Sequence, residues 1–484
     1  MTSYNHIKTH LINANQSHLL RFWDDLTNEE RNEFLVHLNT INFEESNELF
    51  RNALLSLEDD VEKLDSRMKP IPASQFESEE RSTSEQLEKY RRIGLDEISS
   101  GHVGVLLLAG GQGTRLGVSY PKGMYSIGLP SGKTLFQVQA ERIRKVEELA
   151  KRQTGKDGCI TWYIMTSGPT EEATEEFLKT NNFFGLNPEN IVQFDQGLLP
   201  CFDMEGRIIL DSKNRVALAP DGNGGIYRAL HRKGVLADME RRGIRYLHVH
   251  SVDNILVKVA DPIFVGYCVD KQADCGAKVV KKAGPSEAVG VVCQVDGRFQ
   301  VVEYSEITEA TANLRNEEGE LVFNAGNICN HFFSTKFLNQ VAEQHEKKLK
   351  LHVAKKKIPF VNEFGEKEKP TKVNGIKIEK FVFDVFQFSD NFVTWEVPRH
   401  TEFSALKNSD DAGKDCPSTA RNDLFVLHKN YVEAAGGTVE GDVVEISPLL
   451  SYAGEDLTPL VKEKVFQSPV LLTAEEVITN GHSH

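Results

Sequence analysis

The sequence predicts an α/β protein with a parallel or mixed central sheet, a helical region before the sheet and a small domain after it. Two observations predict this class. Short apolar runs typical of buried strands recur at 103–108, 159–165, 245–252 and 290–295. Acidic segments with helical spacing, such as 171–178, lie between these runs. Strands that alternate with helices in this way form a sheet covered by helices.

The order of these segments divides the chain into three parts. Thr27-x-x-Glu30 is a capping box and Asn42-x-x-Glu45 is a second helix start, so 16–60 reads as helices. The charged stretch 57–92 contains Pro70 and Pro72 and is expected to be a helical arm. We therefore predict an N-terminal helical domain at 1–102, an α/β domain at 103–405 and a small C-terminal domain at 406–484.

Composition excludes several classes of protein. The chain is 40% hydrophobic and 26% charged, which is ordinary for a globular protein and unlike a disordered or fibrous one. Its net charge of −15 argues against binding to nucleic acid or to an anionic membrane, because both need excess basic residues. No apolar run approaches the ~18 residues of a membrane span, and the start lacks an apolar signal core. The seven cysteines form no C-x-x-C pair, as expected of reduced thiols in a cytoplasmic protein.

A glycine-rich loop, residues 108–117, directly follows the first predicted strand. Backbone N–H groups at Gly110, Gly111 and Gly113 can approach an anion closely. The loop fails the dinucleotide fingerprint because position 116 is leucine, and the better P-loop match, 128–134, is one residue short. By itself, a glycine-rich loop of this kind is a purely structural turn about as often as it is a binding site. The nearby Arg115 and Lys122 suit a triphosphate, although each could be a solvated surface charge.

Other candidates have a plain structural explanation beside the functional one. Residues 221–225, Asp-Gly-Asn-Gly-Gly, could be only a tight turn. Asp253 comes at the carboxyl end of a strand, where open α/β sheets bind ligands, although a lone aspartate is more often a helix cap. His248 and His250 share a strand face, and we expect them to be packing residues rather than metal ligands. The lysine cluster at 347–357 is expected to be a solvated helix face.

Residues 108–117, followed by Pro121-Lys122-Gly-Met, resemble the signature of the eukaryotic UDP-sugar pyrophosphorylases. From Leu20-Arg-Phe-Trp to 446–455 the chain resembles the UDP-N-acetylhexosamine (UDP-N-acetylglucosamine) pyrophosphorylase branch. The resemblance implies a Rossmann-like, mixed-sheet nucleotidyltransferase core of GT-A type. It also implies a reaction: UTP and N-acetylglucosamine 1-phosphate give UDP-N-acetylglucosamine and pyrophosphate. N-acetylgalactosamine 1-phosphate is expected to be a second substrate.

The resemblance also assigns roles to residues. It implies that Arg115, Lys122 and Lys377 are catalytic, and that Asp253 binds Mg²⁺, with Mn²⁺ as a possible substitute. Gln196 matches the residue that reads uracil, Gly222 lies near the nucleotide, and Asn223 binds the sugar. The other residues expected to bind substrate are Leu108, Ala109, Gly110, Gly111, Gly290, Glu303, Tyr304, Asn327 and Lys407.

Three alternatives remain open at this stage. The protein could be a UDP-glucose or broad-specificity UDP-sugar pyrophosphorylase, or a nucleotide-sugar sensor without catalysis. A nicotinamide dehydrogenase is disfavoured by Leu116. The segment 438–445 has a length suited to a tight hairpin, where longer family members carry an insert that reaches a neighbouring subunit. We therefore expect a monomer rather than a homodimer.

Overall fold

The computed structural model describes residues 4–56, 61–474, 477–479 and 482–483. Its internal contacts divide the chain into two units. Unit 1 comprises Met1–Lys63, Gln196–Arg228 and Glu346–Asp384, and unit 2 comprises Leu64–Asp195, Ala229–His345 and Val385–His484. Each unit is therefore assembled from three separate stretches of the sequence. The division at 102 and 405 stays a prediction.

Unit 1 packs helices onto small antiparallel sheets. Its helices are α1 (Tyr4–Asn13), α2 (Asn28–Asn39) and α3 (Phe43–Ser56). The predicted capping box at Thr27 is formed, and Asn42 Oδ1 accepts a hydrogen bond from the Glu45 backbone N–H at 3.0 Å. Strands β16 (His352–Lys356), β19 (Gly375–Glu379) and β7 (Phe202–Asp203) form an antiparallel sheet. Leu11, Phe34 and Ile376 meet in one buried core.

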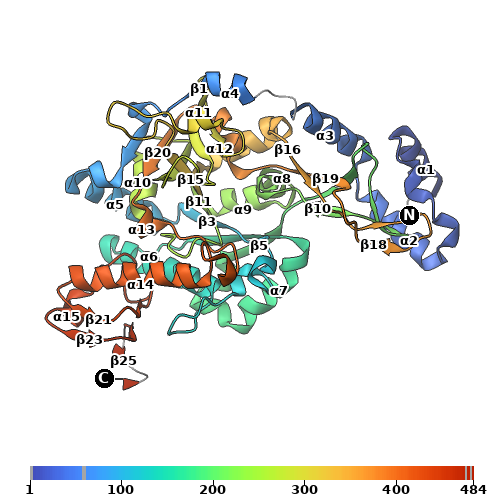
Figure 1. Ribbon diagram of the computed structural model, residues 1–484. Coiled ribbons are helices and arrows are strands. Elements are labelled where there is room, and N and C mark those ends of the chain that lie inside the picture. The colour runs from blue at the N-terminus through green and yellow to red at the C-terminus, as the bar shows by residue number, and fades with distance from the viewer. Residues whose placement is uncertain (1–3, 57–60, 475–476, 480–481, 484) are drawn as a thin grey trace. The chain divides into compact units, whose positions relative to one another are not determined.

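Unit 2 is built around a mixed sheet, as predicted (Figure 1). Along the main path of this sheet, neighbouring strands run parallel except β15, which is antiparallel to β12 and β11. The strands that pair off this path, β1, β13 and β14, are antiparallel to their partners. Predicted strands 103–108, 159–165 and 245–252 are β3, β4 and β11, and 290–295 is β13 (Val291–Val295), which pairs with β14 (Arg298–Val302). The strand order is β2 (Phe76–Ser78), β20 (Phe392–Glu396), β12 (Cys275–Lys281), β15 (Ala325–Ser334), β11 (Tyr246–Ser251), β3 (Val103–Leu108), β4 (Thr161–Thr166), β5 (Ile191–Asp195).

Alternate side chains of each central strand point to opposite faces of this sheet. On β4, buried Trp162 packs edge-on against Phe136 of α6 (Leu135–Thr154). The next residue, Tyr163, donates a hydrogen bond to Asp238 of α9 (Val235–Arg242) at 2.9 Å. Helices α6 and α9 thus cover opposite faces, so both faces of the sheet are buried.

Helices α5 (Ser84–Ser99) and α10 (Pro262–Asp270) approach each other very closely. A Cβ on Gly94 would lie 2.0 Å from the Pro262 carbonyl oxygen, and one on Gly266 would lie 1.8 Å from the Tyr90 carbonyl oxygen. Only glycine leaves room for backbones at this separation. The two glycines therefore fix how α10 packs beside the sheet.

Two sequence-based expectations about local structure are wrong. The arm 57–92 is helical at α4 (Val61–Arg67) and in the first half of α5, but β1 (Met68–Lys69) pairs with β13, and β2 joins the main sheet. Pro70 favours extended backbone in the residue before it, which explains why the helix gives way to a strand. Residues 57–60 lie outside the described part. The lysine cluster at 347–357 is not one helix face, because Lys355 and Lys356 lie on β16.

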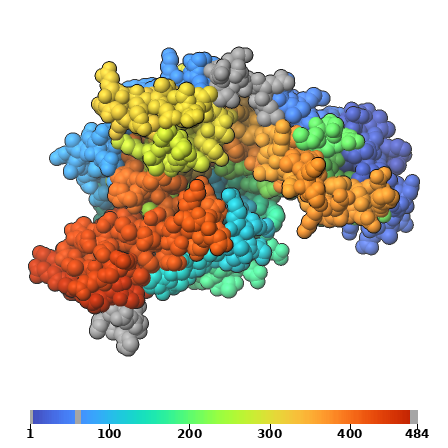
Figure 2. Space-filling view, viewed as in Figure 1, coloured from blue at the N-terminus to red at the C-terminus, as the bar shows by residue number. Residues whose placement is uncertain are grey.

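The C-terminal segment also differs from expectation. Strand β21 (Thr438–Glu440) pairs with β23 (Val465–Gln467), and β22 (Val444–Ile446) pairs with β24 (Val470–Leu472), both in parallel. Residues 438–445 therefore form no hairpin, because each half finds a partner later in the chain. With α14 (Pro417–Ala434), these strands enclose a small core of their own and form a continuous orange-red surface in Figure 2.

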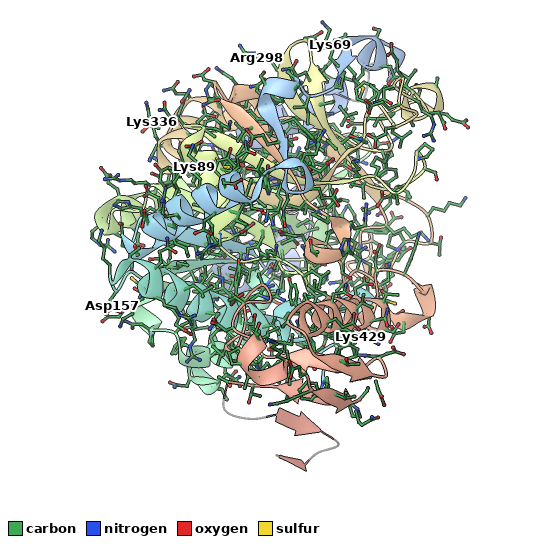
Figure 3. The ribbon with its side chains drawn as sticks, turned by 90° about the vertical axis from the view of Figure 1, so that its left-hand side faces the viewer. Lys69, Lys89, Asp157, Arg298, Lys336 and Lys429 are labelled. Atoms are coloured by element: carbon green, nitrogen blue, oxygen red, sulfur yellow. The ribbon has the colours of Figure 1, made fainter. Side chains whose placement is uncertain are left out.

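Charges are spread over the outside of unit 2. Figure 3 shows Asp157, Arg298 and Lys336 at the periphery, on different elements of the fold. Among the described residues, none of the helices is both long and apolar enough to cross a bilayer.

Candidate active site

The glycine-rich loop leaves the end of β3 and is anchored at its base. The Ala109 N–H donates to the Met165 carbonyl at 2.9 Å, and the Ser167 hydroxyl donates to the Gly110 carbonyl at 2.7 Å. Leu108 and Ala109 are buried, whereas Gly111 is exposed. A Cβ on Gly111 would meet no other described atom within 4 Å. The loop thus combines a fixed base with an open backbone that a phosphate could approach.

Lys122 is held next to this loop. Its backbone N–H donates to the Gly111 carbonyl at 3.2 Å, and its ammonium donates to the Leu406 carbonyl at 3.0 Å. The following Gly123 lies against Phe136, where a Cβ would come within 2.2 Å of the ring. Arg115, in a short 3₁₀ turn, is exposed. The two predicted basic residues therefore differ: Lys122 is fixed and Arg115 is at the surface.

Asp253 lies just beyond β11, at the carboxyl edge of the sheet. Lys122 Nζ is 3.5 Å from Asp253 Oδ2, and the Ser251 hydroxyl donates to the Asp253 carboxylate. Burial opposes ionisation, but Lys122, the Ser251 hydroxyl and Lys407 outweigh it and lower the pKa of Asp253. The structure therefore places the cations of Lys122 and Lys407 near the ionised carboxylate of Asp253. Ser251 was not foreseen, although its position two residues before Asp253 was visible in the sequence.

Asp253 fits a cation that takes most of its ligands from substrate. In the described part of the chain, no group of three His, Cys, Asp or Glu side chains could hold a metal ion. A lone ionised carboxylate is a usual protein contribution to Mg²⁺, which keeps waters and phosphate oxygens as its other ligands. A zinc ion would instead take three or four side-chain ligands.

His248 and His250 are packing residues, as predicted. Both are buried, with their rings stacked at 5.3 Å. His248 Nε2 is hydrogen-bonded to Asn330 Oδ1 at 2.8 Å. Burial lowers the pKa of His250 to about 4, so this imidazole is neutral at physiological pH.

Gly290, Glu303 and Asn327 are brought together at a second corner of unit 2. The Asn327 N–H donates to the Gly290 carbonyl at 2.8 Å. A Cβ on Gly290 would lie 3.0 Å from Glu303 Oε1, so the glycine makes room for that carboxylate. Glu303 is half-buried just after β14, and the neighbouring Tyr304 is 54% exposed. Gly290, Glu303 and Asn327 therefore form one cluster, with the exposed Tyr304 beside it, and its role in binding the sugar stays a prediction.

Cys329 connects this cluster with Asp253. It lies on β15 with φ of +53°, and its N–H donates to Asn327 Oδ1 at 3.2 Å. Burial raises the pKa of Cys329 to about 12, and the charges of Asp253 and Lys407 also act on it. The predicted sugar and cation groups are therefore neighbours. Nothing in the sequence marked Cys329. Its positive φ belongs to an irregularity in the pairing of β15 with β12, which only the structure shows.

Unit 1 holds the remaining predicted residues. Gln196 is buried, and the Gly197 carbonyl next to it accepts from the Asp221 N–H at 3.1 Å. Residues Asn223–Gly225 form a 3₁₀ turn, preceded by Gly222 at φ of +84°. Asn223 Oδ1 accepts from the Val382 N–H at 2.9 Å. The Gln196 and Gly222–Asn223 segments thus adjoin within this unit.

Lys377, the last predicted residue of unit 1, is half-buried on β19. Its strand neighbour is Ala354 of β16, and its charge acts on the thiol of buried Cys201. The lysine is therefore held on a regular strand rather than on a loop.

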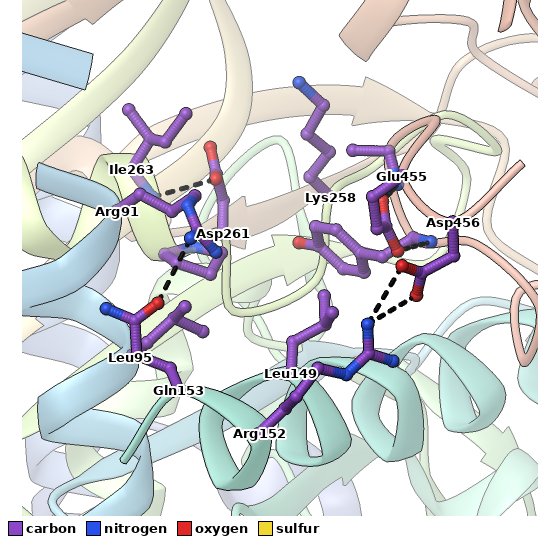
Figure 4. A pocket seen from close by; sticks show the side chains of 13 residues that line it. Arg91, Leu95, Leu149, Arg152, Gln153, Lys258, Asp261, Ile263, Glu455 and Asp456 are labelled. Carbon is purple, nitrogen blue, oxygen red and sulfur yellow. Dashed lines mark hydrogen bonds and ion pairs between the residues drawn. The ribbon is translucent and has the colours of Figure 1, made fainter. Parts of the chain in front are cut away.

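A cavity of about 530 Å³ in unit 2 lies apart from these residues (Figure 4). Its charged side chains are engaged with other groups: Arg152 binds Asp456 at 2.7 Å, and Arg91 donates to Gln153 at 3.1 Å. None of the residues that line it is a predicted site residue. It carries no part of the candidate active site.

The chain is similar to known proteins along most of its length. A family model described as UTP–glucose-1-phosphate uridylyltransferase matches residues 44–451. A human protein named UDP-N-acetylhexosamine pyrophosphorylase-like protein 1 is 49% identical over 98% of each chain. A Saccharomyces cerevisiae protein named UDP-N-acetylglucosamine pyrophosphorylase is 41% identical, covering 94% of this chain and 96% of the relative.

Solved structures give the same result for the fold. The uridine diphosphate N-acetylglucosamine pyrophosphorylase of Trypanosoma brucei is similar, with a TM-score of 0.83 and 31% identity over 93% of each chain. A Leishmania major UDP-glucose pyrophosphorylase, at 18% identity, has a TM-score of 0.61, covering 90% of this chain and 84% of that one, and shares the fold alone. The fold implied by the sequence resemblance is confirmed.

Proposed function

The chain belongs to the UTP–glucose-1-phosphate uridylyltransferase family, and we propose that it transfers the uridylyl group of UTP to N-acetylglucosamine 1-phosphate. The products are UDP-N-acetylglucosamine and pyrophosphate. The observation that carries the proposal is the ionised Asp253 with Lys122 at the end of β11, beside an open glycine-rich loop. The names of the yeast and trypanosome relatives support the choice of sugar.

The chemistry needs no general base. An oxygen of the sugar phosphate, already anionic at neutral pH, attacks the α-phosphorus of UTP. A new P–O bond forms as the bond to the β-phosphate oxygen breaks, and pyrophosphate leaves with that electron pair. The protein's tasks are to align two anions that repel each other and to neutralise charge on the leaving group.

The basic residues divide this work. We assign Lys122, fixed at the glycine-rich loop, and Arg115 to the leaving pyrophosphate. Lys407, whose charge acts on Asp253, is assigned to the incoming phosphate, and the family resemblance assigns Lys377 to it as well. Asp253 would hold Mg²⁺, or Mn²⁺ in its place. When bound, the ion neutralises phosphate charge. The lowered pKa of Asp253 supports this assignment, because a cation needs the ionised carboxylate.

Recognition of the two substrates uses the other residues. The Gln196 amide reads uracil, which offers an N–H donor beside carbonyl acceptors. Backbone of Leu108, Ala109, Gly110, Gly111 and Gly222 approaches the nucleotide. The sugar is bound by Asn223, Gly290, Glu303, Tyr304 and Asn327, three of which cluster in unit 2.

The choice of sugar is the decisive experiment. A pocket built to hydrogen-bond an acetamido group leaves polar groups unpaired when glucose 1-phosphate enters, which supports discrimination by a large factor. Pyrophosphate release is measured with the 1-phosphates of N-acetylglucosamine, N-acetylgalactosamine and glucose. We expect the first to be best, the second weaker and the third poor. Equal kcat/KM for glucose and N-acetylglucosamine phosphates would show a broad UDP-sugar enzyme.

The same measurement tests for a sensor. A nucleotide-sugar sensor would bind UTP and release no pyrophosphate with any sugar phosphate. The presence of Lys122, Asp253 and Lys407 around one site supports an enzyme, because charges placed in this way can stabilise a transition state. We also assign the protein to the cytoplasm, which its seven free thiols support.

A further inference from the structure

Asp221 lies between two turns of unit 1 and is only 5% exposed. A Cβ on Gly225 would come within 1.9 Å of Asp221 Oδ1, and one on Gly197 within 2.5 Å of Oδ2. The carboxyl group therefore fills the space that these two glycines leave. Its own backbone also joins both sides, because the Asp221 N–H donates to the Gly197 carbonyl and the Asp221 carbonyl accepts from the Lys380 N–H at 2.8 Å.

The two turns are those that carry predicted substrate residues. One contains Gln196 and the other contains Gly222 and Asn223. Gly224 is pinned from the far side, since its N–H donates to the Lys380 carbonyl at 2.8 Å. The Asp221 side chain is thus the spacer between the segment that reads the base and the segment that lies between base and sugar.

Asp221 Oδ1 is buried without a hydrogen-bond partner among the described residues. An ionised carboxylate in such a position is costly, because water is removed and Oδ1 gains no donor in its place. A neutral carboxyl group avoids most of this penalty. The geometry therefore favours the protonated acid.

The surrounding charges are already balanced. Lys380 Nζ donates to Glu346 Oε1 at 2.5 Å. Arg228 forms a bidentate pair with Glu346, at 2.9 and 3.0 Å, and a second pair with Glu45 at 2.6 Å. Two cations thus face two carboxylates, and ionisation of Asp221 would add an unbalanced negative charge. In agreement, burial raises the pKa of Asp221 to about 7 against the attraction of Lys380 and Arg228.

We propose that Asp221 is a positioning residue which, as the neutral acid, sets the spacing of the Gln196–Gly197 and Gly222–Gly225 turns, so that nucleotide affinity falls when it ionises. The identity of the nucleotide, UTP, rests on the proposed function. The proposal adds a pH dependence that comes from a side chain behind the substrate residues rather than from the reacting groups.

The test compares the full-length wild type with Asp221→Asn, which keeps the shape and cannot ionise. UTP binding is measured by calorimetry between pH 6 and 8.5, without sugar phosphate. We expect the wild-type Kd to rise about tenfold relative to that of the variant over this range, the order of effect that a misplaced contact has. Taking the ratio removes the titration of UTP itself. Parallel curves for the two proteins would overturn the proposal.

A matched control is Asp211→Asn. The Asp211 carboxylate also belongs to unit 1, but it is partly exposed and pairs with Lys367 at 2.7 Å. Its removal should leave the pH dependence of the wild type unchanged. If Asp221→Asn does not fold, Asp221→Ser gives the same comparison with a smaller uncharged side chain.

Thermal unfolding separates this proposal from the proposed function. The folded pKa of Asp221 lies above the ordinary value near 3.9, so its stabilising effect is present at low pH and is lost as pH rises toward 7. The Tm of the wild type minus that of Asp221→Asn should fall between pH 5 and 7 and be constant above. That fall without UTP binding in either protein would refute the proposed function alone. UTP binding with a constant Tm difference would refute the role of Asp221.

Discussion

At the scale of single residues, Lys122 and Asp253 determine each other's chemistry. The ammonium helps to keep the carboxylate ionised in a partly buried place, where its side chain is 21% exposed. The same ammonium is hydrogen-bonded to the Leu406 carbonyl, so it can remain in place when a cation takes over the carboxylate. One pair therefore combines an ionised carboxylate, the proposed cation ligand, with a fixed positive charge.

Asp253→Asn should keep the fold and most UTP contacts but lose metal-dependent turnover. The amide has nearly the same shape and no charge, and a cation is bound mainly by charge. Turnover is measured against Mg²⁺ and Mn²⁺ concentration, with UTP binding as a check on the fold. Activity close to that of the wild type would remove Asp253 from the metal-binding role.

Lys122→Ala should lower kcat much more than it raises the KM for sugar phosphate, because we propose that its charge acts on the leaving pyrophosphate. Loss of one transition-state partner typically lowers the rate roughly 10²–10³-fold. Lys179→Ala is the control, since Lys179 is an exposed lysine paired with Glu175 on the helix Gly168–Thr180. A change confined to sugar affinity would place Lys122 with the incoming phosphate instead.

At the scale of elements, a buried ion network holds the segment that carries Lys407. Lys278 on β12 is fully buried and bonds Asp261 at the start of α10 and Glu402 at the end of α13 (Arg399–Glu402), at 2.6 and 2.8 Å. From Glu402 the chain continues to Ser404, whose N–H donates to Asn254 Oδ1 at 3.0 Å. The network therefore ties the segment 402–407, which ends at Lys407, to the loop after Asp253.

Lys278→Met should destabilise the protein by about 3–5 kcal/mol, because it leaves the buried Asp261 carboxylate without its ion-pair partner and Glu402 with Lys258 alone, at 3.1 Å. Lys281→Met on the same strand is the matched control: Lys281 pairs with Glu320 at 3.1 Å, and both side chains are half exposed. Exposed pairs contribute at most ~1 kcal/mol. Urea unfolding of both variants gives the comparison. Equal effects would show that the buried network has no special part in stability.

Some elements of the fold could be predicted from the sequence and others could not. Strands β3, β4, β11 and β13 were predictable because each is a short apolar run. Strand β15 was not predicted, because it mixes Asn327, Asn330 and His331 with apolar residues and is bent at Cys329. The site residues were identified by family resemblance, not by spacing: Lys122 and Asp253 are 131 positions apart and meet only through the sheet. Asp221 could not be found, because its role depends on burial.

At the scale of the whole molecule, we expect a monomer. Residues 438–445 pair within the C-terminal segment through β21 and β22, rather than extending outward as an arm. The net charge of −15 adds repulsion between copies at low salt. A stable interface usually buries at least ~1,000 Å² in total, which the eight residues 438–445 cannot supply alone.

Light scattering at micromolar concentration measures the state of assembly. A mass near 54.3 kDa is the expected result. Twice that mass, unchanged on dilution and in high salt, would show a dimer formed by another surface.

Unit 1 is made of three stretches that lie far apart in the chain, and this has a consequence for synthesis on the ribosome. The core around Leu11 and Phe34 includes Ile376 and Ile378, so the first helices emerge long before the strand that covers them. At about 5–20 residues per second, this delay is on the order of 20–70 s. During that time the apolar faces of the nascent N-terminal helices are exposed, and they are natural binding sites for chaperones.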